Sequence, residues 1–261
     1  MVALGLFMEQ QNLICGDFAD LAASFETALR NREVTAISST PTFWRLALMS
    51  IDSDVITGAP LVSISMGGEI VDQAILDELA RLFPDARIRH IYASSEAGAA
   101  IVVTDGKAGF ASKLADPAGT RTIGIKVEED RLYIRSPYSN KSDADGWVDT
   151  GDLVELRGDR YLFCGRAGNT TINVGGQKAF PPDIEAHLNA HPQVVWSQVT
   201  ARRAPLMGNL PVASVVLTAD ADRADAERML TEHCTNGLAE YAVPRMWEFF
   251  DTIPMRASLK S

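Results

Sequence analysis

The chain has 261 residues, of which 46% are hydrophobic and 22% are charged, and its formal net charge is −10 at pH 7. This composition is that of a globular protein and excludes the disordered and fibrous classes, while the acidic balance argues against a nucleic-acid or anionic-membrane partner. The three cysteines are far apart and fit no disulfide framework, so we expect a reduced, cytoplasmic setting. No apolar run reaches the roughly 20 residues that a membrane span needs, and the start lacks the basic region of a signal peptide.

Strands and helices alternate over the first 105 residues. Apolar residues at helical spacing predict helices over 17–29, 40–48 and 70–83. Between and after them, β-type runs predict strands over 34–38, 61–66, 88–93 and 99–104. This alternation predicts a mostly parallel sheet covered by helices.

Shorter β-type runs follow over residues 106–166. They are expected at 122–127, 131–136, 152–156 and 160–164. Arg157-Gly158-Asp159 separates the last two runs at hairpin spacing, so we interpret it as a turn. This stretch is predicted to form a small antiparallel, barrel-like β-unit.

A compact α+β unit is predicted for residues 167–261. One helix is expected to begin at Pro182. A second helix is expected over 222–236, with Gly237 as its C-terminal cap. Strands are expected over 194–200, 212–217 and 247–250. His187 and His191 are four residues apart, but no third metal ligand is nearby, so we place them on a solvated helix face.

Four short segments carry the chemical information of this sequence. Each alone is typical of a turn, a loop or a helix start. In chain order they are Tyr92-Ala-Ser-Ser-Glu96 (preceded by Gly67-Gly68-Glu69), Gly146-Trp-Val-Asp-Thr-Gly-Asp152, Gly165-Arg166 with Gly175-Gly176 to Glu185, and Ile253 to Lys260. Together and at these spacings, from about residue 34 to the last, the chain resembles the C-terminal part of the adenylate-forming ligases. That superfamily comprises acyl-CoA synthetases, peptide-synthetase adenylation domains and luciferases.

The resemblance implies a fold class and a domain organisation. The class is α/β and α+β: a partial large domain, made of an α/β sheet and a small β-barrel-like unit, followed by a small C-terminal α+β domain. Residues 1–105 would be the α/β part of the large domain, truncated at its start, and residues 106–166 its β-barrel-like subdomain. Residues 167–261 would be the mobile C-terminal domain.

The resemblance also implies an AMP-forming acid–thiol ligase. In that family a carboxylic acid and ATP give an acyl-adenylate, which a thiol then converts to a thioester. We favour CoA as the thiol, and the phosphopantetheine of a carrier protein stays an alternative. The identity of the acid is open.

Residue roles for the first step follow from matched positions. Glu96 would hold Mg²⁺, a cation that prefers carboxylate oxygens, and the Ser95 hydroxyl would contact a phosphate oxygen. Lys260 would stabilise charge on the α-phosphate and the attacking carboxylate. The remaining nucleotide contacts would come from Tyr92 beside adenine, Asp152 on the ribose hydroxyls, Arg166 on ribose and phosphate, and the loop of Gly67, Gly68 and Glu69.

For the second step the resemblance implies that the C-terminal domain turns about a hinge. Gly168 occupies the hinge position, where the family normally has Asp or Lys, and Leu259 stands where Gly is common before the lysine. Gly175 and Gly176 would form the loop that admits the thiol-bearing arm, since neither has a Cβ.

The larger departure is the family's phosphate-gripping loop, a Ser/Thr/Gly-rich segment ending in Lys, which we do not find in residues 1–92. We therefore expect little activity from the chain alone. A companion polypeptide supplying the N-terminal subdomain would restore it, and self-association is an alternative. A different class of function, a non-catalytic binding or scaffold protein derived from such a ligase, also stays open.

Overall fold

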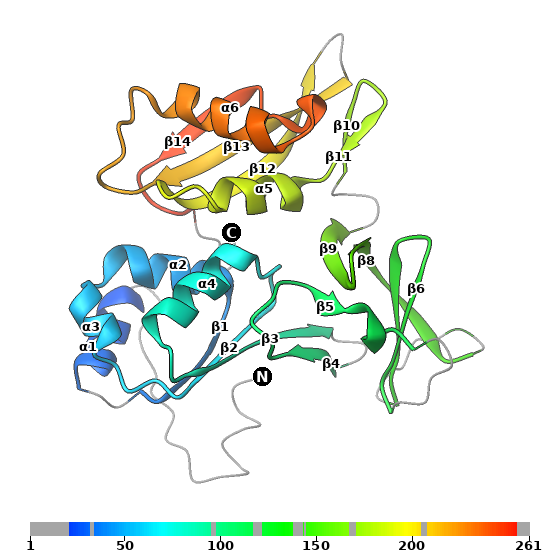
Figure 1. The fold of residues 1–261 in the computed structure, drawn as a ribbon, viewed down its shortest axis with the longest axis horizontal. Coiled ribbons are helices and arrows are strands. Elements are labelled where there is room, and N and C mark those ends of the chain that lie inside the picture. The colour runs from blue at the N-terminus through cyan, green and yellow to red at the C-terminus, as the bar shows by residue number, and fades with distance from the viewer. Residues whose placement is uncertain are drawn as a thin grey trace.

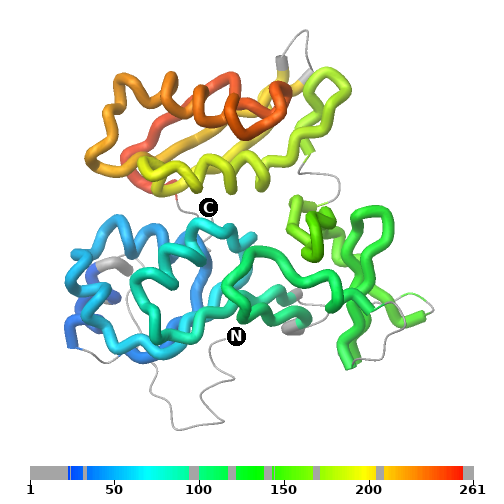
Figure 2. Tube along the Cα trace, in the orientation of Figure 1, coloured from blue at the N-terminus to red at the C-terminus, as the bar shows by residue number. Residues whose placement is uncertain are grey.

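The computed structural model describes residues 21–31, 34–94, 98–116, 122–137, 143, 145–166, 171–204 and 208–254. Within these ranges the chain forms three sheets, each built from one continuous stretch of sequence (Figure 1). The tube view shows the C-terminal unit, yellow to red, lying over the part formed by the first two sheets, blue to green (Figure 2).

The first sheet contains four strands in the order β1-β2-β3-β4, and helices pack on it. Strands β1, β2 and β3 are parallel, whereas β4 is antiparallel to β3. The strands are β1 (Ala36–Ser39), β2 (Ser63–Gly67), β3 (Arg87–Ser94) and β4 (Gly98–Val103), and the helices are α1 (Leu21–Arg30), α2 (Pro41–Ser50), α3 (Ser53–Thr57) and α4 (Gln73–Leu82). Trp44, Ile64 and Leu79, all fully buried, belong to the core between helices and sheet. The predicted mostly parallel sheet is confirmed.

Capping residues decide where two of these helices begin. The Thr40 side chain accepts a hydrogen bond from Phe43 N at 3.2 Å, and Pro41 opens the first turn of α2, as expected. The predicted start of the next helix at residue 70 is wrong. Helix α4 begins at Gln73 because Asp72 caps it, accepting from Ile75 N at 3.1 Å. Val71, which the helical stripe had included, precedes the helix and is buried in the core, and Ile70 is exposed.

The second sheet is antiparallel throughout, in the order β5-β9-β8-β7-β6. Its strands are β5 (Phe110–Ala111), β6 (Gly124–Glu128), β7 (Arg131–Arg135), β8 (Trp147–Arg157) and β9 (Arg160–Arg166). Arg157 pairs with Arg160 across a tight turn, so the predicted hairpin is confirmed. Phe110, Leu132 and Val154 are buried in its core.

The third sheet and two helices form the C-terminal unit. Strands β11 (Gln177–Ala179), β10 (Ile172–Val174), β13 (Gly208–Leu217) and β12 (Val194–Ala204) lie in that order, and β14 (Met246–Phe250) runs parallel to β13. The helices are α5 (Pro181–Asn189) and α6 (Ala226–Gly237). The α+β architecture is confirmed, although α6 begins four residues later than predicted. The Asp222 carboxylate is used in the preceding turn, where it accepts from Ala224 N at 3.0 Å.

The breaks between sheets agree with the predicted boundaries. Strand β4 ends at residue 103 and β5 begins at 110, while β9 ends at 166 and β10 begins at 172. Whether 1–105, 106–166 and 167–261 are separate domains stays a prediction.

Two expectations about helices α5 and α6 are wrong: the exposure of His187 and the capping role of Gly237. The His187 ring stacks on the His233 ring at 4.2 Å, and each ring nitrogen Nε2 lies 3.0 Å from the backbone oxygen of the other histidine. His187 therefore packs between the helices and does not lie on a solvated face. Gly237 is the last residue of α6, capped by Leu238 in an extended conformation, so it is not the cap. A Cβ at position 237 would lie 2.0 Å from His187 Cε1, which explains why glycine is present.

We expect Gly237→Ala to lower the free energy of unfolding by about 1–2 kcal/mol, because the histidine pair must separate to admit the methyl group. In a His187→Ala background the same change should be neutral or stabilising by up to about 1 kcal/mol, since alanine favours a helix over glycine. Urea unfolding of the four proteins in this cycle measures both values. Equal effects of the glycine change in the two backgrounds would contradict the packing explanation.

Candidate functional site

A cavity of about 480 Å³ lies where the first sheet meets the second. Residues 68–71 after β2 form one wall, the end of β3 forms another, and β8 and β9 close the third side. The residues that line this cavity include Gly68, Glu69, Tyr92, Asp152, Phe163 and Arg166. Three motif segments that are far apart in the sequence therefore meet at one cavity.

Asp152 is the centre of the polar group in this cavity. The Tyr92 hydroxyl donates a hydrogen bond to Asp152 Oδ2, and Arg166 Nε lies 3.2 Å from Asp152 Oδ1. Arg166 Nη2 also donates to the Thr150 carbonyl at 2.9 Å. Asp152 is 18% exposed and Arg166 is 69% exposed, so the carboxylate lies inside the cavity and the guanidinium at its mouth.

The electrostatics keep Tyr92 a donor. Burial, followed by the hydrogen bond to Asp152, raises the pKa of the Tyr92 hydroxyl well above its usual value. The phenol therefore stays protonated at neutral pH, and its ring is stacked on Phe163 with centroids 5.0 Å apart. Together these contacts fix both the Tyr92 ring and the Asp152 carboxylate.

Among the residues that the structure describes, only one carboxylate oxygen of Glu69 accepts hydrogen bonds. Its Oε2 accepts from Thr42 N at 3.1 Å and from Thr42 Oγ1 at 2.8 Å, at the first turn of α2. This contact places the carboxylate at the positive end of the helix dipole. Its Oε1 is enclosed and has no hydrogen-bond partner among the residues that the structure describes.

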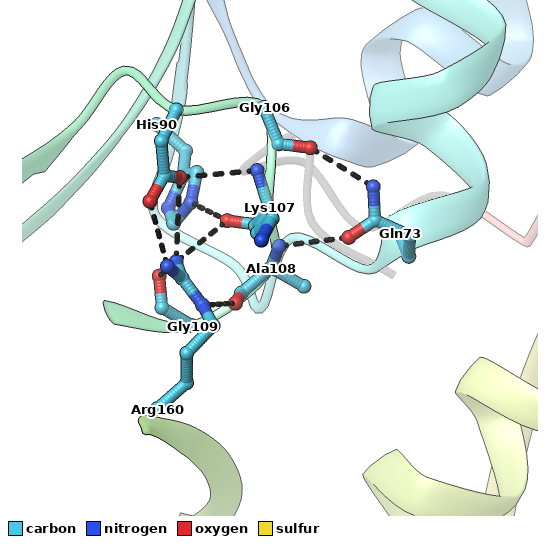
Figure 3. Close-up of polar contacts among 8 residues, drawn as sticks. Gln73, His90, Gly106, Lys107, Ala108, Gly109 and Arg160 are labelled. Carbon is cyan, nitrogen blue, oxygen red and sulfur yellow. Dashed lines mark hydrogen bonds and ion pairs between the residues drawn. The ribbon is translucent and has the colours of Figure 1, made fainter. Parts of the chain in front are cut away.

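Side chains from β9 and α4 hold the loop at residues 105–109 (Figure 3). The Arg160 guanidinium binds Asp105 Oδ2 at 2.6 Å and donates to the carbonyls of residues 107, 108 and 109 at 3.0–3.1 Å. Gln73 holds the same loop from α4, through Gly106 O at 2.9 Å and Ala108 N at 3.0 Å. Because Gly109 lines the cavity, this network fixes part of its wall.

Three predicted site residues that the structure describes, Gly67, Gly175 and Gly176, do not line this cavity. Gly67 ends β2, and a Cβ there would lie 2.7 Å from Ile91 O, so it permits close packing of β2 on β3. Gly175 and Gly176 form the turn between β10 and β11, with open space around them. The predicted residues Ser95, Glu96, Gly168 and Lys260 lie outside the described residues. Among described residues, no group of His, Cys, Asp and Glu is arranged to hold a metal ion.

Sequence reasoning missed the residues that support the site. Phe163, which stacks on Tyr92, and Thr42, which holds Glu69, make contacts across 71 and 27 positions, which no local pattern reveals. The signal available for Thr42 was its place in Thr40-Pro41-Thr42 at a predicted helix start.

A second cavity, of about 770 Å³, lies between the C-terminal unit and the rest of the structure. Glu185 of α5 lies beside it, with Oε1 accepting from Val199 N at 2.7 Å. Burial raises the pKa of Glu185, the Val199 N–H lowers it and the Asp72 carboxylate raises it, and the resulting pKa is about 7. Part of this shift therefore comes from a charge on the opposite side of the interface.

This shift predicts a pH dependence of stability. In the folded state the pKa of Glu185 is above its ordinary value of 4.5. Its contribution to the free energy of unfolding is therefore fully present below about pH 4.5 and is lost as pH rises through about 7. We expect Glu185→Gln, which keeps the acceptor oxygen, to be more stable than the wild type by of the order of 2 kcal/mol at alkaline pH and by much less in acid. Thermal unfolding between about pH 5 and about pH 8 measures the difference. The exposed Glu232→Gln should show no such trend.

Comparison with known proteins shows which proteins the chain is similar to. Residues 183–260 match the family described as AMP-binding enzyme C-terminal domain. The chain is 33% identical over 129 residues to 2-succinylbenzoate–CoA ligase of Bacillus licheniformis, covering 49% of the chain and 26% of the ligase. It is 25% identical over 252 residues to luciferin 4-monooxygenase of Nipponoluciola cruciata, covering 86% and 46%. A crystal structure of an anthranilate CoA ligase with anthranoyl-AMP superposes with a TM-score of 0.73 at 20% identity, covering 94% of this chain and 51% of that one.

These findings establish the adenylate-forming ligase fold and confirm the resemblance to that superfamily. The chain spans between about a quarter and a half of the length of these relatives. No helix among the described residues is long and apolar enough to cross a membrane.

Proposed function

We propose that the chain supplies the nucleotide-binding and C-terminal parts of an AMP-forming acid–thiol ligase. The observation that carries the proposal is the cluster of Tyr92, Asp152 and Arg166 at one cavity. Asp152 would accept hydrogen bonds from both ribose hydroxyls, because an ionised carboxylate is acceptor-only and this one is held rigid. Arg166 would reach ribose and phosphate from the mouth, and adenine would lie near Tyr92 and the loop of Gly68 and Glu69.

The chemical step needs charge neutralisation, because carboxylate and ATP are both anions. In the proposal Glu96 holds Mg²⁺, which would neutralise phosphate charge when bound. Ser95 and Lys260 contact the phosphates, and Lys260 also contacts the attacking carboxylate. The described residues contribute orientation: they hold the nucleoside so that its α-phosphate is fixed relative to the acid.

The thioester step would use the same chain in a second arrangement. In the present arrangement Gly175 and Gly176 do not line the cavity that contains Asp152. We infer that the C-terminal unit reorients about the segment containing Gly168 before a thiol arm enters. CoA is the favoured acceptor, since several relatives are named as CoA ligases, and a carrier-protein phosphopantetheine stays the alternative.

A companion polypeptide with the phosphate-gripping loop, or self-association, belongs to the same proposal. Residues 1–92 contain no such loop, so acid activation would require one from elsewhere. The competing proposal is a non-catalytic binding or scaffold protein with the ligase fold. The cavity argues against it, because an inert scaffold has no physical need for an aligned tyrosine, carboxylate and guanidinium.

Equilibrium binding of AMP to the purified full chain tests the proposal. Saturable binding at up to millimolar AMP, competed by an acyl-adenylate analogue, is the expected result. Absence of binding at millimolar AMP would favour the scaffold function. A pull-down from the native source, analysed by mass spectrometry, tests for a companion that carries the missing loop.

A further inference from the structure

A buried polar group joins the C-terminal unit to the first sheet and its helices. Arg45 Nη2 of α2 lies 2.5 Å from Asp72 Oδ2, and the two side chains are 9% and 12% exposed. The C-terminal unit adds two contacts. Its Val195 carbonyl accepts from Arg45 Nη1 at 3.3 Å, and its Asn189 Nδ2 donates to the same Asp72 oxygen at 3.4 Å.

Asp72 connects this group to the nucleotide cavity. Its second oxygen, Oδ1, caps α4 through Ile75 N at 3.1 Å. The four residues before it, 68–71, line the cavity. One carboxylate therefore fixes the end of the cavity wall, the start of α4 and the docking position of the C-terminal unit.

The other contacts across this interface are less selective. Trp196 and Val216 pack against Leu46 and Met49, but apolar packing has little directional preference. The Arg157–Asp183 pair, at 2.6 Å, is 46% and 26% exposed, and ion pairs with this exposure contribute little.

A buried ion pair selects an orientation more than it adds stability, because any other arrangement that covers it leaves its donors and acceptors unpaired. The observed orientation brings an amide to Asp72 and a carbonyl to Arg45. Asn189 is itself positioned, since its Oδ1 accepts from Ser197 Oγ at 3.0 Å.

We propose that Arg45, Asp72 and Asn189 form an interdomain latch that holds the C-terminal unit in this orientation over the cavity, with Asp72 as the positioning residue. The latch goes beyond the proposed ligase function and needs no nucleotide. It must open whenever the C-terminal unit turns.

Asn189→Asp tests the latch with almost no change in shape. It places a carboxylate against Asp72, so the two repel and we expect the ratio of docked to open molecules to fall about tenfold. The readout is fluorine NMR of the fluorotryptophan-labelled full chain without nucleotide. Trp196, 3% exposed and packed on α2, reports docking, and a Trp196→Phe variant assigns its resonance.

Asn236→Asp is the matched control, because Asn236 is exposed and also lies in the last turn of its helix. It should leave the Trp196 resonance unchanged. The double variant Asp72→Asn with Asn189→Asp removes the repulsion, because only one carboxylate then remains at the interface, and asparagine still offers an oxygen to cap α4. We expect it to restore docking.

The latch is overturned if Asn189→Asp docks like the wild type, if Asn236→Asp opens the interface equally, or if the double variant stays as open as the single one. Since no nucleotide is present, failure of AMP binding would reject the ligase proposal and leave this result standing.

Discussion

Gly109→Ala is expected to lower the free energy of unfolding by about 3 kcal/mol or more. Gly109 has φ +68°, a backbone conformation that costs an L-residue about 1–2 kcal/mol. A Cβ would also lie 2.2 Å from the Tyr161 carbonyl oxygen and 2.7 Å from Leu162 Cδ2. The backbone contact is with β9 itself, so relief would require moving a strand of the sheet.

Gly106→Ala separates the two causes of this loss. Gly106 lies in the same loop with φ +73°, but a Cβ there would have no neighbour within 4 Å. It should therefore cost only the conformational part, about 1–2 kcal/mol. Urea unfolding followed by far-ultraviolet circular dichroism compares the two variants. Equal losses would mean that strain of the loop, and not its contact with β9, makes Gly109 necessary.

Asp152→Asn is expected to weaken AMP binding by about 10- to 100-fold, which corresponds to losing hydrogen bonds made by a charged group. The amide keeps the shape of the side chain but offers one acceptor oxygen in place of two. The remaining oxygen must then serve Tyr92, Arg166 and the ligand. Calorimetric titration of AMP into each protein measures the change.

Asp149→Asn is the matched control for this experiment. Asp149 lies three residues earlier on β8 and pairs with Arg131 at the surface, 2.5 Å away. Its variant should bind AMP like the wild type. If Asp152→Asn also bound AMP like the wild type, Asp152 would not be the ribose acceptor.

The elements predicted correctly are those whose start or turn is set by residues within a few positions in the sequence. Thr40 and Pro41 set the start of α2, and Arg157-Gly158-Asp159 turns between β8 and β9, as expected. The predicted start of α4 was wrong because Val71 is buried in the core without being helical, and the helix is capped by Asp72. Periodicity indicates that a residue is covered, but not that it belongs to the helix.

The errors at Gly237 and His187 have a long-range cause. The partner of His187 is His233, 46 positions later, so neither the stacked rings nor the need for a glycine beside them was visible locally. The candidate site was predicted in a different way. The meeting of Tyr92, Asp152 and Arg166 came from the resemblance of ordered motifs, whereas Phe163 and Thr42 required the fold.

Two of the charged residues on strand β8 make contacts in different parts of the structure. Asp152 lines the cavity between the first two sheets, and Arg157, at the end of the same strand, reaches Asp183 of the C-terminal unit. The pairing of β8 with β9 shifts between Leu153 and Val154, so one irregular step already separates the two residues. Adding or deleting a single residue there would turn one of them to the opposite side of the sheet. The stretch from Asp152 to Arg157 should therefore tolerate changes of side chain far better than changes of length.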